Sequence, residues 1–265
     1  MANISNLAFV HPEAKLADDV VIGAFCYIDR NVEIGAGTKV HSHVSILSGA
    51  RIGKNNVIYE GAIISATPQD FRWKGEESYV EIGDGNHIRE QVIINRSIHK
   101  EGKTRVGNNT FIMAQSHVGH DSEIGNYCVL GNSVKVAGDV KIGDFSILSS
   151  HALVHEKCQV AEWVLVKGGC RVNGHVPPFV VMAHNPISYY GVNAYVLKKA
   201  NKSEALIDDI AKCYRHVYQN SASVYNALRR IREDIEPSPE RDSILSFIEG
   251  HKMNLAGVPK SDIED

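Results

Sequence analysis

The chain has 265 residues, a formal net charge of −3 at pH 7 and a hydrophobic content of 43%. The slight acidic excess argues against a nucleic-acid-binding protein, because such proteins usually carry a basic excess. The five cysteines include no C-x-x-C pair, which favours a reducing cytoplasm over a disulfide framework or a zinc site. We expect neither a signal peptide nor a membrane span, since no apolar run has the required length.

A hydrophobic repeat of six residues begins at Val10. Almost every sixth position from there to Val172 is Ile, Val or Leu, and only positions 70, 76 and 100 fail. The positions two residues earlier favour small side chains and include four of the cysteines, which we interpret as apolar filler. A six-residue unit makes one short strand and a corner, so three units predict one triangular coil of a parallel β-helix. Glycine often follows the aliphatic position, where we expect it to supply unusual backbone angles. The periodicity leaves the handedness open.

Two polar segments, residues 67–78 and 95–104, interrupt the repeat without changing its register. We expect both to be loops on a rigid scaffold, where binding residues tend to lie. The prism is predicted to span residues 1–185 and to end near the prolines of "VPPFVV". Hydrophobic spacing then becomes helical, which predicts a helical domain over residues 186–265. Its helices are expected after Ser203, from about Ser221, and after Pro239.

The corner "HVGHD" at residues 117–121 is the strongest candidate for chemistry. Residues 18 apart stack on one another in successive coils, so His120, Gly138 and Glu156 are predicted to form a column. His117 and His155 occupy neighbouring positions of the repeat. An imidazole, a backbone N–H group and a carboxylate would then meet on one surface. The pattern alone leaves open both a catalytic site and a solvated surface histidine.

The hexads, the loop "PQDFRWKGE", the corner "HVGHD", the segment "VHEKCQV" and the junction "VPPFVV…GVNAYVLKK" resemble one enzyme family over nearly the whole chain. This is the acyl-[acyl-carrier-protein]–UDP-N-acetylglucosamine O-acyltransferase family, which begins lipid A synthesis. The resemblance implies a left-handed parallel β-helix and a cytoplasmic homotrimer with active sites between neighbouring prisms. It also implies transfer of a 3-hydroxyacyl chain from acyl carrier protein to the 3-hydroxyl of UDP-N-acetylglucosamine, without a metal or dissociable cofactor.

The resemblance further implies roles for individual residues. His120 matches the general base, Asp121 the carboxylate that orients it, and Gly138 the glycine whose N–H stabilises the oxyanion. Substrate binding is expected from residues in the loop, in the cleft and at the junction: Gln69, Asp70, Arg72, His117, Asp139, His155, Glu156, Asn193 and Lys199. Acyl length is expected to depend on residues at the far end of the cleft: Leu165, Gly168 and Pro186.

Some positions depart from the family pattern. Arg72, Asp139 and Glu156 stand where lysine, histidine and glutamine are usual, and Ala200 replaces one residue of a basic pair. These departures favour, as an alternative, a divergent paralogue that acts on another sugar nucleotide or binds one without catalysis. A second alternative is a carbonic-anhydrase-like zinc trimer, to which His117 and His120 would each contribute a ligand.

Overall fold

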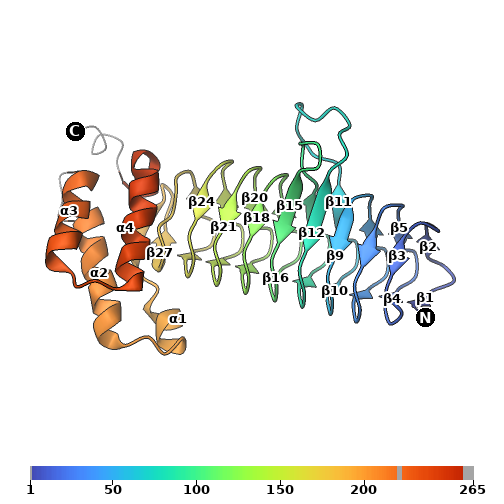
Figure 1. Ribbon diagram of the computed structural model, residues 1–265, viewed down its shortest axis with the longest axis horizontal. Coiled ribbons are helices and arrows are strands. Elements are labelled where there is room, and N and C mark those ends of the chain that lie inside the picture. Colours follow the sequence, from blue (N-terminus) through green and yellow to red (C-terminus); the bar gives the residue numbers. More distant parts are fainter. Residues whose placement is uncertain (1, 220–222, 259–265) are drawn as a thin grey trace.

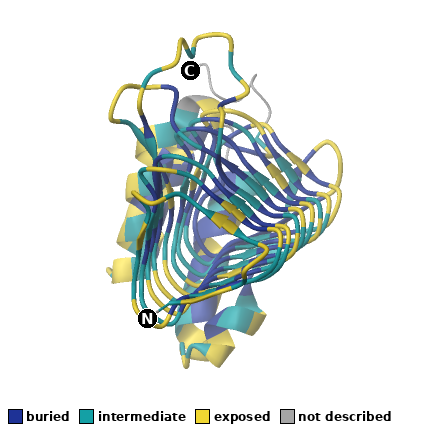
Figure 2. Ribbon diagram, turned by 90° about the vertical axis from the view of Figure 1, so that its right-hand side faces the viewer, coloured by how far each residue is buried: buried dark blue, intermediate teal, exposed yellow. Residues whose placement is uncertain are grey.

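The computed structural model describes residues 2–219 and 223–258. Short strands wind into a long prism, and a group of helices closes one end of it (Figure 1). The cross-section is triangular, and buried residues line its interior (Figure 2). Ser221, where we expected the second helix to begin, lies outside the described residues, as do residues 1 and 259–265.

Each side of the prism is one sheet of stacked strands. Sheet A contains, in spatial order, β1 (Asn3–Ile4), β4 (Val21–Ile22), β7 (Lys39–Val40), β10 (Val57–Ile58), β13 (His87–Ile88), β16 (Phe111–Ile112), β19 (Val129–Leu130), β22 (Ile147–Leu148), β25 (Leu165–Val166), β27 (Val180–Ala183) and β28 (Ser188–Val192). Sheet B contains β2 (Phe9–Val10), β5 (Tyr27–Ile28), β8 (Ser45–Ile46), β11 (Ile63–Ala66), β14 (Ile93–Asn95), β17 (His117–Val118), β20 (Lys135–Val136), β23 (Leu153–Val154) and β26 (Arg171–Val172). Sheet C contains β3 (Lys15–Leu16), β6 (Glu33–Ile34), β9 (Ala50–Ile52), β12 (Tyr79–Ile82), β15 (Lys103–Val106), β18 (Glu123–Ile124), β21 (Lys141–Ile142) and β24 (Gln159–Val160).

The register shows how the two excursions are absorbed. In regular coils the paired residues are 18 positions apart, as for Asn56 N and Thr38 Oγ1. The spacing rises to 30 between Asn86 and Asn56, across the loop at 67–78. It is 24 between Thr110 and Asn86, across the shorter excursion. Each excursion therefore adds whole six-residue units, and every later aliphatic residue still points inward.

The interior is filled by the two inward positions of each repeat. The large aliphatic residues are almost completely buried, including Ile28, Ile64 and Val118. The other inward positions hold Ala, Ser, Thr, Val, Cys or Asn, and Ser122 uses its hydroxyl to donate to the Ala137 carbonyl at 2.8 Å. Burial raises the pKa of the Cys128 thiol to about 11, so this cysteine is an unreactive filler.

The glycines that follow the aliphatic positions have a different role from the one we expected. Gly119 has no positive φ; instead, a Cβ there would lie 2.7 Å from the backbone carbon of Ala137 in the next coil. Positive φ occurs at the second turn residue, which is often not glycine, as at His43 (60°) and Asp121 (60°). The glycines are therefore required by the close approach of successive coils, and our prediction of unusual backbone angles was wrong for them.

The helical end consists of α1 (Ala194–Lys199), α2 (Glu204–Tyr218), α3 (Val224–Asp234), α4 (Pro239–His251) and the 3₁₀ turn η1 (Lys252–Asn254). The hydroxyl of Ser203 caps α2 by accepting from the N–H of Leu206 at 3.2 Å. Helix α1 was not expected from the sequence, since the expected helices begin after Ser203. The last strand, β28, runs antiparallel to β27 and lies beyond residue 185, so the sheet continues past the expected end of the prism.

Candidate active site

Both excursions leave the prism at one edge, where sheet B passes into sheet C; we call it the B–C edge. Residues 67–78 connect β11 to β12 there, and residues 96–102 connect β14 to β15. The next coils place three turn pairs at the same edge: His120–Asp121, Gly138–Asp139 and Glu156–Lys157. The loop at 67–78 rises from this edge in Figure 1. One edge thus carries most of the residues that the sequence singles out.

His120 and Asp121 form a hydrogen-bonded pair in the turn after β17. The Nδ1 atom of His120 lies 2.9 Å from Oδ2 of Asp121. An ionised carboxylate only accepts hydrogen bonds, so the ring donates through Nδ1, and the neutral tautomer that does so carries its lone pair on Nε2. Adjacent side chains on a strand diverge, but the positive φ of Asp121 turns the two together.

The second excursion fixes the Asp121 carboxylate, a role that the sequence did not reveal. The Ser97 hydroxyl donates to Oδ1, and the Ile98 N–H donates to Oδ2 at 3.1 Å. The Thr104 hydroxyl accepts from the backbone N–H of Asp121 at 2.8 Å. The only signal for these contacts was that the excursion begins one coil before the histidine corner. The network holds both the carboxylate and the ring that it faces.

Gly138 lies directly against the imidazole of His120. A Cβ at this position would come within 2.4 Å of the ring atoms Cε1 and Nε2. The N–H of Asp139 donates to the His120 carbonyl at 3.0 Å and stacks the two turns. The N–H of Gly138 itself has no hydrogen-bond acceptor within residues 2–219 and 223–258. A main-chain donor is therefore available beside the imidazole.

The long loop brings a second carboxylate to the histidine. Oδ2 of Asp70 lies 3.4 Å from Nε2 of His120. Arg72 holds Asp70 with a fork: its Nε donates to Oδ1 at 3.0 Å and its terminal nitrogen to Oδ2 at 2.8 Å. These hydrogen bonds, together with the Arg72 backbone N–H, hold the pKa of Asp70 far below its usual range.

Asp139 and Glu156, two of the residues that depart from the family pattern, both act on the guanidinium of Arg72. Arg72 has a raised pKa, mainly because of Asp70, and Asp139 and Glu156 add to it through their charge. Glu156 is exposed and its other ionic neighbour is Lys157, at 3.8 Å. Arg72 thus compensates carboxylates from the loop and from two turns of the B–C edge.

Gln69 and His117, two further candidates, line a pocket on the face of sheet B. The pocket has a volume of about 510 Å³ and is lined by Gln69, Gln91, Ile93, Gln115, Ser116, His117 and Lys135. Burial lowers the pKa of His117, and the positive charge of Lys135 lowers it further. His117 is therefore a neutral hydrogen-bonding group at neutral pH. His155 is exposed at the B–C edge, two coils beyond Gly119.

Asn193 and Lys199 lie on a different edge of the prism, where sheet C passes into sheet A. The Asn193 amide donates to the Trp163 carbonyl at 2.9 Å and is buried. Lys199 lies over the ring of Tyr195, with 4.6 Å between Nζ and the ring centroid. It also lines a depression of about 300 Å³ with the stacked rings of Phe145 and Trp163. Within one chain these two residues are not brought together with His120.

The candidates for acyl length lie near the helical end of the prism. Leu165 is on β25, paired with Val181 of β27, and Gly168 is exposed in the turn after β25. Pro186 is exposed between β27 and β28. All three are thus on sheet A or its connections, away from the B–C edge.

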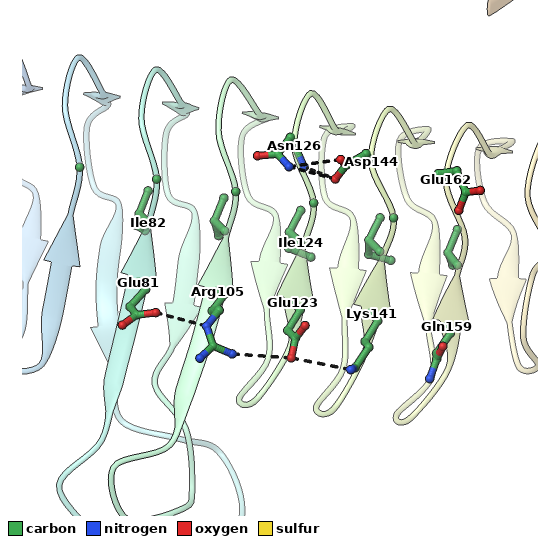
Figure 3. A pocket seen from close by; sticks show the side chains of 18 of the residues that line it. Glu81, Ile82, Arg105, Glu123, Ile124, Asn126, Lys141, Asp144, Gln159 and Glu162 are labelled. Carbon is green, nitrogen blue, oxygen red and sulfur yellow. Dashed lines mark hydrogen bonds and ion pairs between the residues drawn. The ribbon is translucent and has the colours of Figure 1, made fainter. Parts of the chain in front are cut away.

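A larger groove of about 880 Å³ runs along sheet C (Figure 3). Glu81, Arg105, Glu123 and Lys141 form a ladder of alternating charge in it, with N–O distances of 3.2, 3.7 and 3.8 Å. These side chains are partly exposed, so each pair contributes little to stability. None of the candidate residues named above lines the groove.

Comparisons with known proteins agree on one family. A family model described as UDP N-acetylglucosamine O-acyltransferase, domain 2, matches residues 175–256, and the bacterial transferase hexapeptide model matches residues 13–48 and 103–138. A curated acyl-[acyl-carrier-protein]–UDP-N-acetylglucosamine O-acyltransferase from Thermodesulfovibrio yellowstonii is 33% identical over 96% of this chain and 99% of its own.

Solved structures extend the similarity over the whole fold. A UDP-N-acetylglucosamine acyltransferase from Bacteroides fragilis is 44% identical, with a TM-score of 0.92 over 94% of this chain and 97% of its own. The enzyme from Francisella novicida is 36% identical, with a TM-score of 0.92 over 99% and 96%. The coil is thus the left-handed parallel β-helix expected from the resemblance. No helix in the described part of the chain is long and apolar enough to cross a membrane. The chain belongs to the acyl-[acyl-carrier-protein]–UDP-N-acetylglucosamine O-acyltransferase family.

Proposed function

We propose that this protein transfers a 3-hydroxyacyl chain from acyl carrier protein to the 3-hydroxyl of UDP-N-acetylglucosamine, the first step of lipid A biosynthesis. Membership of the family supports the reaction. The single observation that supports the residue roles is the position of His120, which is hydrogen-bonded to Asp121 on one side and packed against Gly138 on the other.

In this mechanism Nε2 of His120 is the general base. It takes the proton of the sugar 3-hydroxyl while the hydroxyl oxygen attacks the thioester carbonyl carbon. The Nδ1–H···Asp121 hydrogen bond favours the required tautomer and stabilises the imidazolium that forms. When the tetrahedral intermediate collapses, the carbon–sulfur bond breaks and the carrier thiolate takes the proton from the imidazolium. The products are the ester and the free thiol of the carrier.

Gly138 is the proposed oxyanion donor. Its N–H has no acceptor in the described parts of the chain and lies beside the imidazole. A donor placed there meets the negative charge that develops on the thioester oxygen, an effect worth about 3 kcal/mol in comparable enzymes. Because the donor belongs to the backbone of a stacked coil, little reorganisation is needed in the transition state.

We assign substrate binding to the residues around this centre. Asp70, held by Arg72, is placed to bind the sugar next to Nε2 of His120. Gln69 and His117 line the adjoining pocket on sheet B. Asp139, His155 and Glu156 complete the B–C edge, and Leu165, Gly168 and Pro186 are assigned to the end of the acyl chain.

We further propose that the active protein is a cytoplasmic homotrimer. Asn193 and Lys199, assigned to the nucleotide, lie on another edge of the prism from His120. They would contact the same substrate only if they came from a neighbouring prism. Sedimentation velocity tests this assembly, since a monomer that retains full activity would contradict it.

A related acceptor is the second candidate. Asp139 and Glu156 put negative charge beside Arg72, at positions where the family usually has neutral side chains or histidine. This charge favours an acceptor or acyl donor that differs from the usual one. A panel of sugar nucleotides, offered with one acyl carrier thioester, separates the two candidates through their relative kcat/KM values.

The zinc alternative has less support. No three His, Cys, Asp or Glu side chains in residues 2–219 and 223–258 of one chain are grouped to hold a metal ion. His120 also engages Asp121 and Asp70 at its two ring nitrogens. Metal analysis of the purified protein tests this alternative, because one zinc per histidine site would contradict the transferase mechanism.

The decisive experiment is product analysis by mass spectrometry. The purified protein is incubated with UDP-N-acetylglucosamine and a panel of 3-hydroxyacyl carrier proteins of different chain length. We expect one preferred chain length and a product heavier than the acceptor by one hydroxyacyl group. If no carrier thioester yields an acylated sugar nucleotide, the proposed function is wrong.

A further inference from the structure

The loop at 67–78 presents Asp70 and Arg72 to His120, but few contacts tie it to the prism. Three of them are at its ends. The Asn95 amide donates to the Thr67 carbonyl at 2.7 Å, and the Glu101 N–H donates to the Glu77 carbonyl at 2.8 Å. The N–H of Arg96 donates to Ala66, just before the loop, at 3.0 Å. The middle of the loop, where Asp70 lies, needs a separate support.

Trp73 is the residue in the middle of the loop that faces the scaffold. It is half-buried, whereas Phe71 and Arg72 beside it are exposed. Its backbone N–H donates to the Asp70 carbonyl at 3.2 Å, and its indole N–H donates to the Glu76 carbonyl at 3.2 Å. Trp73 therefore connects the turn that carries Asp70 with the returning arm of the loop. Whatever fixes this indole also fixes Asp70.

Arg96 is positioned to fix it. Its guanidinium lies over the indole, with 5.4 Å between the guanidinium carbon and the ring centroid. Its terminal nitrogen also donates to the Ser48 carbonyl, two coils earlier, at 3.2 Å. Its Nε is buried and has no hydrogen-bond partner in the described parts of the chain. The prism therefore holds the Arg96 side chain in place, and the flat face of its guanidinium stacks on the indole ring.

We infer that Arg96 is a positioning residue, which stacks on Trp73 and thereby holds the loop at 67–78 in the conformation that brings Asp70 to His120. Arg96 touches neither His120 nor Asp70 directly. Its contribution to catalysis rests on the proposed function, but its effect on the loop does not. The two claims can therefore fail separately.

The test uses Trp73 as a probe of the loop. The chain has two tryptophans, so Trp163→Phe leaves Trp73 as the only one. In this background, Arg96→Gln and Arg96→Lys are compared with the parent by acrylamide quenching of fluorescence. We expect both variants to expose the indole and raise the quenching constant about twofold or more, because lysine lacks the planar face that stacks. An unchanged quenching constant in both variants would overturn the inference.

Steady-state kinetics of the same variants tests whether the loop positions the sugar. We expect Arg96→Lys to raise the KM for the sugar nucleotide about tenfold, while the KM for the acyl donor stays unchanged. The double variant Arg96→Lys/Trp73→Leu should be no worse than Trp73→Leu alone, since both remove the same contact. Additive losses would contradict an action of Arg96 through Trp73. If the parent protein transfers no acyl group, the proposed function fails and the quenching result still decides the role of Arg96.

Arg89 provides the matched control. Its guanidinium lies over the ring of Tyr59, with 4.5 Å to the centroid, and neither residue belongs to the loop. We expect Arg89→Lys to leave both the Trp73 quenching constant and the KM for the sugar nucleotide at the parent values. Equal effects of Arg89→Lys and Arg96→Lys would show a general loss of prism stability and overturn the specific role of Arg96. Thermal unfolding of each variant shows whether the prism remains folded.

Discussion

Oδ2 of Asp70 lies 3.4 Å from Nε2 of His120, although the carboxylate comes from a loop and the imidazole from a corner of the prism. Asp121 faces the other nitrogen of the same ring at 2.9 Å. Nε2 and the Asp70 carboxylate both accept hydrogen bonds, so in the proposed mechanism the 3-hydroxyl donates its proton to Nε2 while a neighbouring donor group of the sugar binds Asp70. In the proposed mechanism, the loop and the corner together bind the sugar at the place where its proton is transferred.

Replacing His120 with Ala should remove the base and leave the prism intact. We expect turnover to fall at least about a hundredfold, the usual size of a general-base contribution. Initial rates at saturating substrates measure the loss, and circular dichroism checks the fold. His43→Gln is the control, since His43 also lies in a turn with positive φ but on another edge and stacks on Phe25. Turnover like that of the wild type in His120→Ala would exclude this histidine from the mechanism.

Gly138→Ala should separate packing at the site from stability of the fold. The added Cβ would meet the imidazole at 2.4 Å, so the ring must move. We expect turnover to fall about a hundredfold, and the free energy of unfolding to fall by about 1–3 kcal/mol, as for other overpacked sites. Steady-state kinetics and urea unfolding measure the two effects.

Gly250→Ala is the control for that variant. Gly250 lies in α4, and a Cβ there meets nothing within 4 Å. We expect unchanged turnover and a gain of about 0.5–1 kcal/mol in stability, because alanine favours the helix. If Gly138→Ala kept full activity, the close contact between Gly138 and the imidazole would have no catalytic importance.

The six-residue period was sufficient to predict the coil and the stacking of His120 under Gly138. This is so because a regular repeat converts a spacing of 18 residues into a neighbour relationship. The contacts of Ser97 with Asp121, of Arg96 with Trp73, and of Asp70 with His120 could not be predicted in the same way. They join residues of two irregular loops, whose conformations depend on the contacts themselves. The role of the glycines was predicted wrongly because two different constraints, close approach of coils and a positive φ, both select glycine, and the sequence does not distinguish them.

Ser97→Ala should show that the second excursion supports the catalytic pair. Ser97 is buried and its hydroxyl donates to Asp121, which would keep only the Ile98 N–H and His120 as donors. We expect turnover to fall about tenfold, and Asp121→Asn to lower it about a hundredfold. The control is Ser146→Ala, because Ser146 is equally buried but donates to the Ala161 carbonyl in another corner. Equal activity of both serine variants would argue against a special role for Ser97.

Arg72→Lys should weaken sugar binding while the net charge is unchanged. The fork that Arg72 forms with Asp70 cannot be made by a single ammonium group, so the carboxylate loses its fixed orientation. We expect the KM for the sugar nucleotide to rise about 3- to 10-fold, with a smaller change in kcat. Arg105→Lys, in the charge ladder of sheet C, is the control and should leave both constants unchanged. A normal KM in Arg72→Lys would mean that charge alone is sufficient.

The stability of the junction between prism and helices should fall in acid because of His175. Burial lowers the pKa of His175, and the positive charge of His251, whose ring centroid is 4.3 Å away, lowers it further. Nδ1 of His175 accepts from the N–H of Gln159 at 3.2 Å, which requires the neutral ring. The unfolded chain therefore binds more protons than the folded one once the pH falls below about 6.5, and stability is lost from there downward. We expect His175→Asn, whose amide oxygen can accept the same hydrogen bond, to unfold at a temperature that changes less between pH 8 and pH 5 than in the wild type. Thermal unfolding at both pH values measures this change. An identical pH dependence in the two proteins would mean that another group causes the acid sensitivity. His117 would then be the next residue to replace, because burial lowers its pKa in the same direction.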